Sequence, residues 1–205
     1  FGGTFDPVHQ GHLILAEQCR EACALDKILF IVAGEPPHKG RPKTAARHRL
    51  EMVELAIAGN DAFEASEIEL ARPGPHYTYE TIEQITAERP GDELFFIIGT
   101  DAFAEIATWS RYPAVLDLAH FVVVSRPGFT LDSLQHRVPD LAERMTTPAR
   151  FDFSAQSRII LLEAPTPAIS STEIRRRARA GEDLAGLVPD NVADYIRTHR
   201  LYRGQ

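Results

Sequence analysis

Short apolar runs alternate along the chain with longer stretches in which apolar residues recur every three or four positions. Runs that are apolar on both faces are typical of central strands in a parallel sheet. Four segments have this pattern: 27–32, 94–98, 119–124 and 158–162. Residues 65–70 alternate apolar and polar side chains instead, so we expect a more exposed strand there.

Helical periodicity separates these strands. It covers the segments 11–24, 44–58, 79–88, 171–180 and 189–198. The alternation predicts an α/β fold with a Rossmann-like, doubly wound parallel sheet, helices on both faces and a small C-terminal helical cap. We expect residues 1–168 to form the α/β domain and residues 169–205 to be a helical segment of that same domain. Ligands of such sheets bind outside the carboxyl ends of the strands.

Composition narrows the function classes. The 205 residues carry a formal net charge of −7, which disfavours a general nucleic-acid binder and requires that cations for an anionic ligand be gathered locally. Cys19 and Cys23 support neither a disulfide framework nor a zinc site, and we expect two reduced, half-buried thiols in a cytoplasmic protein. No apolar run reaches the roughly 18 residues of a membrane span.

The densest cluster of candidate chemistry is the segment 2–12, GGTFDPVHQGH, at the presumed end of a first strand. Paired glycines allow a tight turn and close approach to a ligand, and the following helix start suits a phosphate. His9 and His12 are spaced to face one pocket, with Gly11 between them leaving room. A plain turn, a polar surface pair or half a metal site are the alternatives for the separate pieces.

A second cluster, ISSTEIR at 169–175, follows a strand and opens a helix. Ser170 and Glu173 fit a capping box, which needs no function. Ser171 and the backbone N–H groups beside it are suited to phosphate oxygens, and the forked guanidinium of Arg175 is suited to a pyrophosphate. The arginines that follow belong mostly to a solvated face: Arg176, Arg177 and Arg179.

Together the two segments resemble the motifs of the nucleotidyltransferase superfamily with the His-x-Gly-His signature. Within it, the chain is similar to the bacterial nicotinate mononucleotide adenylyltransferases. Relatives that adenylylate phosphopantetheine typically carry Thr at the position of His9. The resemblance implies that ATP and nicotinate mononucleotide are the substrates. It also implies direct in-line attack of the mononucleotide phosphate on the α-phosphorus of ATP, with pyrophosphate leaving and Mg²⁺ bridging phosphate oxygens without dedicated protein ligands.

The resemblance also assigns residues. It implies catalytic roles for His9, His12, Lys39 and Arg175. It implies ATP contacts from Gly2, Gly3, Thr4, Phe5, His9, Gly11, His12, Gly99, Asp101, Arg126, Ser170, Ser171 and Arg175. For the mononucleotide it implies Lys39 at the phosphate, Thr78 at the carboxylate, Asp101 at the ribose and Trp109 stacked on the pyridine ring.

Three other functions remain open from the sequence. Nicotinamide mononucleotide or phosphopantetheine are alternative acceptors, and a catalytically inactive nucleotide-binding regulator is an alternative of another class. A regulator is expected to have lost at least one phosphate-contacting residue, whereas His9, His12, Lys39, Ser171 and Arg175 are all present. A homo-oligomer is also compatible with the sequence.

Overall fold

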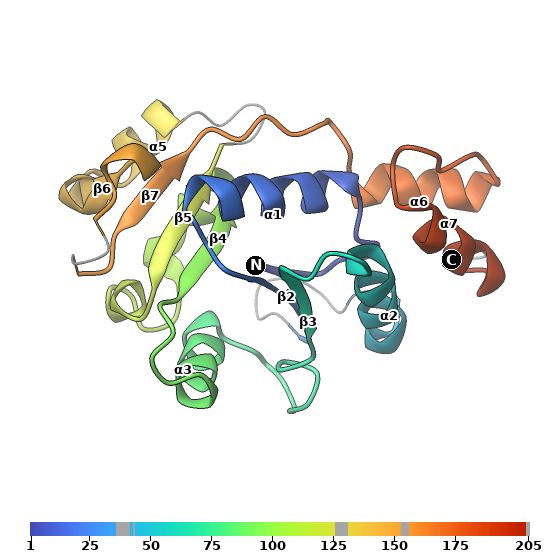
Figure 1. The fold of residues 1–205 in the computed structure, drawn as a ribbon, viewed down its shortest axis with the longest axis horizontal. Helices are drawn as coiled ribbons and strands as arrows, with labels where there is room; N and C mark the ends of the chain where they lie inside the picture. The colour runs from blue at the N-terminus through green and yellow to red at the C-terminus, as the bar shows by residue number, and fades with distance from the viewer. Residues whose placement is uncertain (36–41, 43, 126–130, 153–155, 204–205) are drawn as a thin grey trace. The chain divides into compact units, whose positions relative to one another are not determined.

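The protein was studied as a computed structural model, which describes residues 1–35, 42, 44–125, 131–152 and 156–203. The chain separates into two compact units. The β1 unit comprises residues 2–20, 26–76 and 166–205, and the β4 unit comprises residues 1, 21–25 and 77–165. Each unit contains its own parallel sheet, as the strand arrows of Figure 1 indicate.

The β1 unit is built on three parallel strands in the order β1-β2-β3. Its strands are β1 (Gly2–Gly3), β2 (Ile28–Val32) and β3 (Phe63–Ser66). Its helices are α1 (Gln10–Ala22), whose last two residues belong to the β4 unit, α2 (Ala46–Ile57), α6 (Ser171–Ala180) and α7 (Asp190–Thr198).

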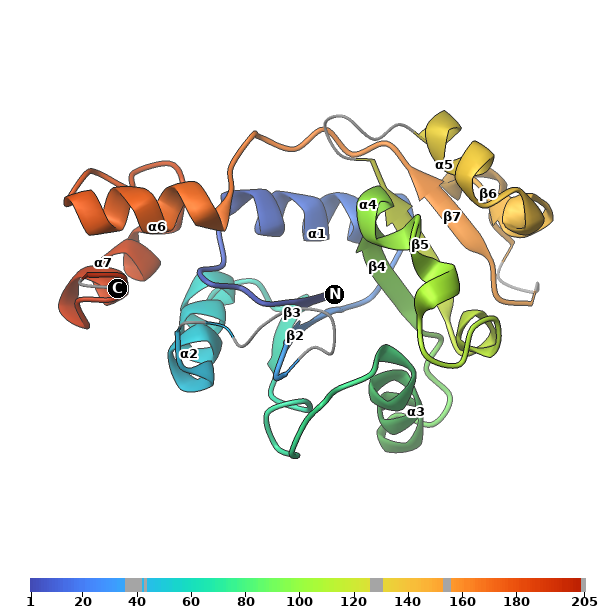
Figure 2. The ribbon, with the colours of Figure 1, turned by 180° about the vertical axis from the view of Figure 1, so that it is seen from behind.

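Helix α2 joins the C-terminal helices to the first sheet. It packs on β2 and β3 through one face, and α7 packs on α2, as both Figure 1 and Figure 2 show. Helix α7 buries Val192 and Ile196, and the side chain of Asn191 donates a 2.7 Å hydrogen bond to the Leu55 carbonyl near the end of α2. The C-terminal residues are therefore part of the β1 unit.

The β4 unit is built on four parallel strands in the order β4-β5-β7-β6. Its strands are β4 (Phe95–Gly99), β5 (His120–Val124), β6 (Met145–Thr146) and β7 (Ile159–Leu162). Its helices are α3 (Thr78–Glu88), α4 (Thr100–Phe103), α5 (Leu131–Arg137) and the short 3₁₀ turns η1 (Ile106–Thr108), η2 (Ala114–Asp117), η3 (Pro139–Arg144) and η4 (Pro148–Arg150). Every residue of β5 is buried, as its continuous apolar run predicts.

The predicted α/β class, the Rossmann-like arrangement of parallel strands and the C-terminal helices are confirmed. The hydrogen bonds of the described strands divide these strands between two sheets. One predicted boundary was wrong. The more exposed strand was expected at 65–70, but β3 spans 63–66 and is half-buried, because the chain turns at Ser66: its hydroxyl accepts from the Ile68 N–H at 3.3 Å, and Leu70 N–H donates to Glu67 O at 2.7 Å.

The described part of the chain also contains no helix with the length and apolar character that a membrane crossing requires. The two cysteines form no disulfide in the described part of the chain. They were expected to be half-buried, but they lie deeper: Cys19 is 0% exposed and Cys23 is 4% exposed. Burial raises the pKa of the Cys23 thiol to about 11, so this thiol is protonated at neutral pH.

Candidate functional site

The loop that follows β1 has a strained backbone over a tightly packed aromatic ring. Phe5 is 2% exposed and has a φ of +47°, a region that bulky residues rarely adopt. Its ring lies against Gly3, where an added Cβ would meet the Phe5 Cζ at 2.7 Å. Only glycine therefore fits at position 3 with this loop conformation, which explains the second glycine of the predicted pair.

The two histidines of the loop form a stacked pair at the start of α1. The rings of His9 and His12 lie 3.6 Å apart between centroids, at an angle of 19°. A Cβ on Gly11 would meet the His9 Nδ1 at 3.1 Å, so the glycine makes room for the His9 ring. The edge-to-face contact of Phe5 with His12, at 5.1 Å, supports the pair from the other side.

The hydrogen bonding of His12 fixes which nitrogen carries its proton. The backbone N–H of His9 donates to the Nδ1 of His12 at 3.2 Å. Because Nδ1 acts as an acceptor, the neutral imidazole carries its proton on Nε2. His12 is thereby arranged to donate a hydrogen bond from Nε2, the property that stabilisation of a phosphate oxygen requires.

The start of α6 lies directly against this loop. The Ser171 hydroxyl donates to the Pro7 carbonyl at 2.9 Å, and the Arg175 Nη1 donates to the Asp6 carbonyl at 2.7 Å. These partners are 164 and 169 residues apart in the chain. The two motif segments, far apart in the sequence, therefore contact each other within the β1 unit.

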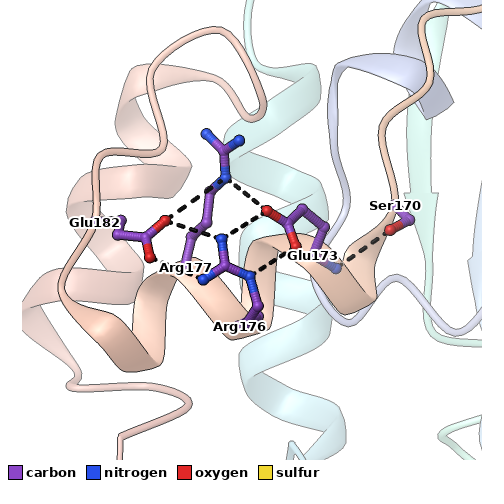
Figure 3. Close-up of polar contacts among 5 residues, drawn as sticks. All are labelled: Ser170, Glu173, Arg176, Arg177 and Glu182. Atoms are coloured by element: carbon purple, nitrogen blue, oxygen red, sulfur yellow. Dashed lines mark hydrogen bonds and ion pairs between the residues drawn. The ribbon is translucent and has the colours of Figure 1, made fainter.

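The remaining side chains of α6 divide between a cap and an ion-pair group. Ser170 is the N-cap, and its hydroxyl accepts from the Glu173 N–H at 3.2 Å. The predicted capping box is half formed, because the Glu173 carboxylate binds Arg176 and Arg177 instead of turning back (Figure 3). Glu182 binds Arg176 from the other side, which agrees with the solvated face predicted for these arginines.

A buried polar group beneath the loop escaped the sequence analysis. Arg49 of α2 is 2% exposed, and its Nη1 donates to the carbonyls of Thr4 and Ala33, each at 2.8 Å. Tyr202 is also 2% exposed, and its hydroxyl donates to the Asp6 carboxylate at 2.9 Å. The available signal was position 49, which falls on the buried face of α2 with Met52, Val53 and Ile57.

The residues expected at the second substrate lie in the β4 unit. Thr78 is the first residue of α3. Gly99, which was expected at ATP, lies in the same unit, where it ends β4 as the N-cap of α4. Asp101 is exposed within α4 and is not its cap. Trp109 follows η1, is half-buried and packs edge-on against Phe96 of β4 at 6.1 Å between ring centroids.

Comparison with known proteins places the chain in a family. The sequence pattern of the family described as cytidylyltransferase-like matches residues 1–177. The chain belongs to the cytidylyltransferase-like family. A protein of Symbiobacterium thermophilum, named "Probable nicotinate-nucleotide adenylyltransferase", is 43% identical over 100% of this chain and 94% of its own. A Roseiflexus protein of the same name is 45% identical over 98% and 96%.

Solved structures support the same fold for this cytidylyltransferase-like chain. The nicotinic acid mononucleotide adenylyltransferase of Plasmodium falciparum, in a structure described as complexed with NaAD, has a TM-score of 0.74. The match covers 98% of this chain and 94% of that one, at 18% sequence identity. At that identity the likeness concerns the arrangement of helices and strands.

Within this cytidylyltransferase-like fold, the predicted site residues form two groups. The structure brings one group together in the β1 unit: Gly2, Gly3, Thr4, Phe5, His9, Gly11, His12, Ser170, Ser171 and Arg175. It places the other group in the β4 unit: Thr78, Gly99, Asp101 and Trp109. Lys39 and Arg126 lie outside the described residues.

Proposed function

We propose that this chain transfers the adenylyl group of ATP to nicotinate mononucleotide, producing nicotinate adenine dinucleotide and pyrophosphate. The observation that carries the proposal is the pair of hydrogen bonds from Ser171 and Arg175 to the loop that ends in His9. Through these bonds the Arg175 guanidinium and the N-terminus of α6 contact the short loop that leads into His9 and His12. The names of the relatives reported above favour nicotinate mononucleotide as the acceptor.

The described groups suit positioning and charge stabilisation better than covalent catalysis. The phosphate of the mononucleotide is itself a nucleophile near neutral pH, so the reaction requires alignment rather than a strong base. His12 donates a hydrogen bond from Nε2 to the α-phosphate, and the ring of His9 stacks against the ring of His12. Arg175 stabilises the departing pyrophosphate, since a guanidinium has more N–H donors than its bonds to Asp6 and Thr172 use.

The two serines at the start of α6 serve differently in this mechanism. The Ser170 hydroxyl accepts a bond as the cap, which leaves its proton for a phosphate oxygen. The Ser171 hydroxyl donates its hydrogen bond to the Pro7 carbonyl. Ser171 therefore reaches a phosphate through its backbone N–H at the helix N-terminus, where the helix dipole favours an anion.

The remaining assignments rest on the family motifs. Trp109 is half-buried, and we assign the pyridine ring to its solvent side, opposite the core on which it packs. Thr78 receives the nicotinate carboxylate, Asp101 the ribose, and Gly99 permits close approach of ATP. Lys39 and Arg126 are proposed phosphate contacts, Lys39 for the mononucleotide and Arg126 for ATP.

Magnesium enters as a partner of the phosphates. Among the described residues there is no group of three or more His, Cys, Asp or Glu side chains arranged to hold a metal ion. Mg²⁺ bound to ATP would neutralise part of the phosphate charge. We assign it to the phosphates of ATP because the family motifs imply it there.

The proposed catalytic domain includes both parts of the chain, residues 1–168 and the helical segment 169–205. The bonds of Ser171 and Arg175 to the N-terminal loop support this view, because they make α6 part of the site. We also propose a cytoplasmic enzyme, since the two buried free thiols suit a reducing compartment.

A panel of acceptors tests the proposal. Pyrophosphate release from ATP is measured with nicotinate mononucleotide, nicotinamide mononucleotide and phosphopantetheine in turn. We expect the first to give the highest kcat/KM and the last to give none. His12→Ala should lower kcat with the best acceptor by about 10²- to 10³-fold, the usual cost of losing one donor to a developing charge. Release without any acceptor dependence, or a preference for phosphopantetheine, contradicts the proposal.

A further inference from the structure

The buried polar group beneath the N-terminal loop consists of Asp6, Arg49 and Tyr202. Their exposed fractions are 6%, 2% and 2%, so all three are removed from bulk water. They come from three parts of the chain: the loop itself, the first turns of α2, and the residues after α7. Buried charges are costly unless they are paired and hydrogen-bonded, so their retention here calls for a physical reason.

Arg49 binds backbone carbonyls of three chain segments that meet beneath the loop. Its Nη1 donates to Thr4 O and to Ala33 O, and its Nε donates to Thr44 O at 3.2 Å. Ala33 directly follows β2, and its N–H donates to Gly3 O at 2.8 Å. One guanidinium therefore joins the ends of β1 and β2 to the start of α2. Burial lowers the pKa of Arg49, while the nearby Asp6 carboxylate opposes that shift.

Tyr202 holds the same loop from the C-terminal end of the chain. Its hydroxyl donates to the Asp6 carboxylate across 196 positions of sequence. Burial and the charge of Asp6 both raise the pKa of this phenol, so it is a permanent hydrogen-bond donor at neutral pH. The adjacent Asp6 carbonyl accepts from Arg175, which means that Asp6 is held through both its side chain and its backbone.

These bonds act on the part of the loop that supports the histidines. Phe5 has a strained φ of +47° between Thr4 and Asp6, and its ring contacts His12. A conformation of this kind persists only where its surroundings over-determine it. The bonds of Arg49 to Thr4 and of Tyr202 to Asp6 lie immediately before and after Phe5, where they supply that constraint.

We propose that Tyr202 and Arg49 are positioning residues for adenylyl transfer, which hold Thr4 and Asp6 so that Phe5 keeps the imidazole of His12 in its reactive orientation. The inference rests on the proposed function. It extends the catalytic apparatus to the last turn of the described chain, although Tyr202 lies outside both recognised motifs. Loosening the loop misplaces His12 relative to the α-phosphate, and a misplacement of about 1 Å can cost about 10²-fold in rate.

The test compares two tyrosines of the C-terminal segment, Tyr195 and Tyr202. Tyr202→Phe removes the hydroxyl that binds Asp6 and keeps the ring. Tyr195→Phe is the matched control, because its hydroxyl makes a contact of the same length, 2.9 Å, to the His48 Nδ1 of α2 instead of to the loop. We expect Tyr202→Phe to lower kcat by about 10- to 100-fold with both KM values within about threefold, and Tyr195→Phe to leave kcat unchanged.

A structural role alone predicts another result. Unfolding midpoints are measured for both variants, and kinetics are recorded well below them. If Tyr202→Phe lowers its midpoint but keeps the wild-type kcat, or if both variants change kcat equally, the positioning role is overturned. Arg49→Lys provides a second variant, since one ammonium cannot reproduce the bonds of the guanidinium, and it should show the same split between kcat and KM.

A spectroscopic reading separates this proposal from the function it rests on. Imidazole ¹⁵N resonances report which nitrogen of His12 is protonated, and they need no turnover. Tyr202→Phe should shift the His12 resonances and Tyr195→Phe should not. If the wild-type protein lacks adenylyl transfer but Tyr202→Phe still shifts the His12 resonances, the proposed function is refuted and the network stands. If Tyr202→Phe leaves both the His12 resonances and kcat unchanged, the network is refuted.

Discussion

At the scale of single residues, the two adjacent glycines of β1 are required for different physical reasons. A Cβ on Gly3 would meet the Phe5 ring at 2.7 Å, whereas a Cβ on Gly2 would have nothing within 4 Å. The first contact lies inside the folded protein. The open space at Gly2 suits the close approach of a ligand, which we propose to be ATP. Glycine is thus required by packing at position 3, and we propose that it is required by ligand binding at position 2.

Gly3→Ala should therefore destabilise the protein and slow the reaction. The added methyl group displaces the Phe5 ring, which supports His12, and such overpacking typically costs about 1–3 kcal/mol. We expect a lower free energy of unfolding in urea and a lower kcat. Gly2→Ala is the control: unfolding should stay at the wild-type value while the KM for ATP rises. Equal effects of the two substitutions on stability would refute the distinction.

At the scale of the element, α6 is a helix whose two ends and exposed face are stabilised by local contacts. Ser170 caps its start, and Gly181 ends it with a φ of +71°, donating to the Ala178 carbonyl. Between them, Glu173 binds Arg176 and Arg177 one turn on (Figure 3). These contacts leave the Ser171 and Arg175 side of the helix directed at the loop.

The ion pairs of Glu173 predict how α6 responds to acid. Hydrogen bonds from Arg176, and then from Arg177, lower the pKa of Glu173 from 4.5 to about 2. A carboxylate whose pKa is lowered by folding stabilises the fold above its unfolded pKa, and that contribution is lost as the pH falls from about 4.5 towards 2. Glu173→Gln should remove this part of the acid sensitivity, measured as amide exchange of α6 across that range.

A neighbouring pair of substitutions controls this titration. Arg176→Ala removes the largest cause of the lowered pKa, so the midpoint of Glu173 should rise towards 4.5. Arg179→Ala removes an exposed arginine of the same helix that is outside the group of Figure 3, and it should leave the midpoint unchanged. Glu173 is a surface carboxylate, so these effects should diminish in high salt. If Arg176→Ala left the titration midpoint of Glu173 unchanged, Arg176 would not be the main cause of the lowered pKa.

At the scale of the whole molecule, the proposed anionic ligand meets an acidic chain at the point where the two motifs bring together a guanidinium and two imidazoles. The net charge is −7, yet the β1 unit brings Arg175, His9 and His12 to one loop. Ligand binding there stabilises the folded state by mass action. The dependence of unfolding on ATP is therefore a measure of the site that does not require turnover.

Arg175→Ala should abolish most of the stabilisation by ATP. At a concentration of about 100 times Kd, a ligand adds about 2.7 kcal/mol to the free energy of unfolding. We expect wild type and Arg176→Ala to gain comparable amounts, because Arg176 binds Glu173 and Glu182 rather than the loop. Each variant is compared with its own ligand-free unfolding, which removes the structural effect of losing the bond to Asp6. Equal gains in both variants would place ATP away from Arg175.

The features that depend on neighbours a few positions away in the chain could be predicted from the amino-acid sequence. Strand and helix periodicity predicted the α/β class, the strands β2, β4, β5 and β7, and the helices α1, α2, α3, α6 and α7 within a few residues. It did not predict the short elements α4, α5, β6 and the 3₁₀ turns. The two motifs identified His9, His12 and Arg175 as candidate groups. Residues 65–70 show the limit, because the turn at Ser66 overrode the alternating pattern. Such signals are local, since helical and extended backbones repeat over short distances.

The hydrogen bonds between groups far apart in the sequence became known from the folded structure alone. The pattern marked position 49 as a core face of a helix but not that a guanidinium there would find three carbonyls. Nor did it indicate that Tyr202 would meet Asp6, because a contact across 196 positions depends on how α2 packs on the sheet and how α7 packs on α2. A buried charge is tolerable only where packing supplies its partners, and packing is a property of the folded chain.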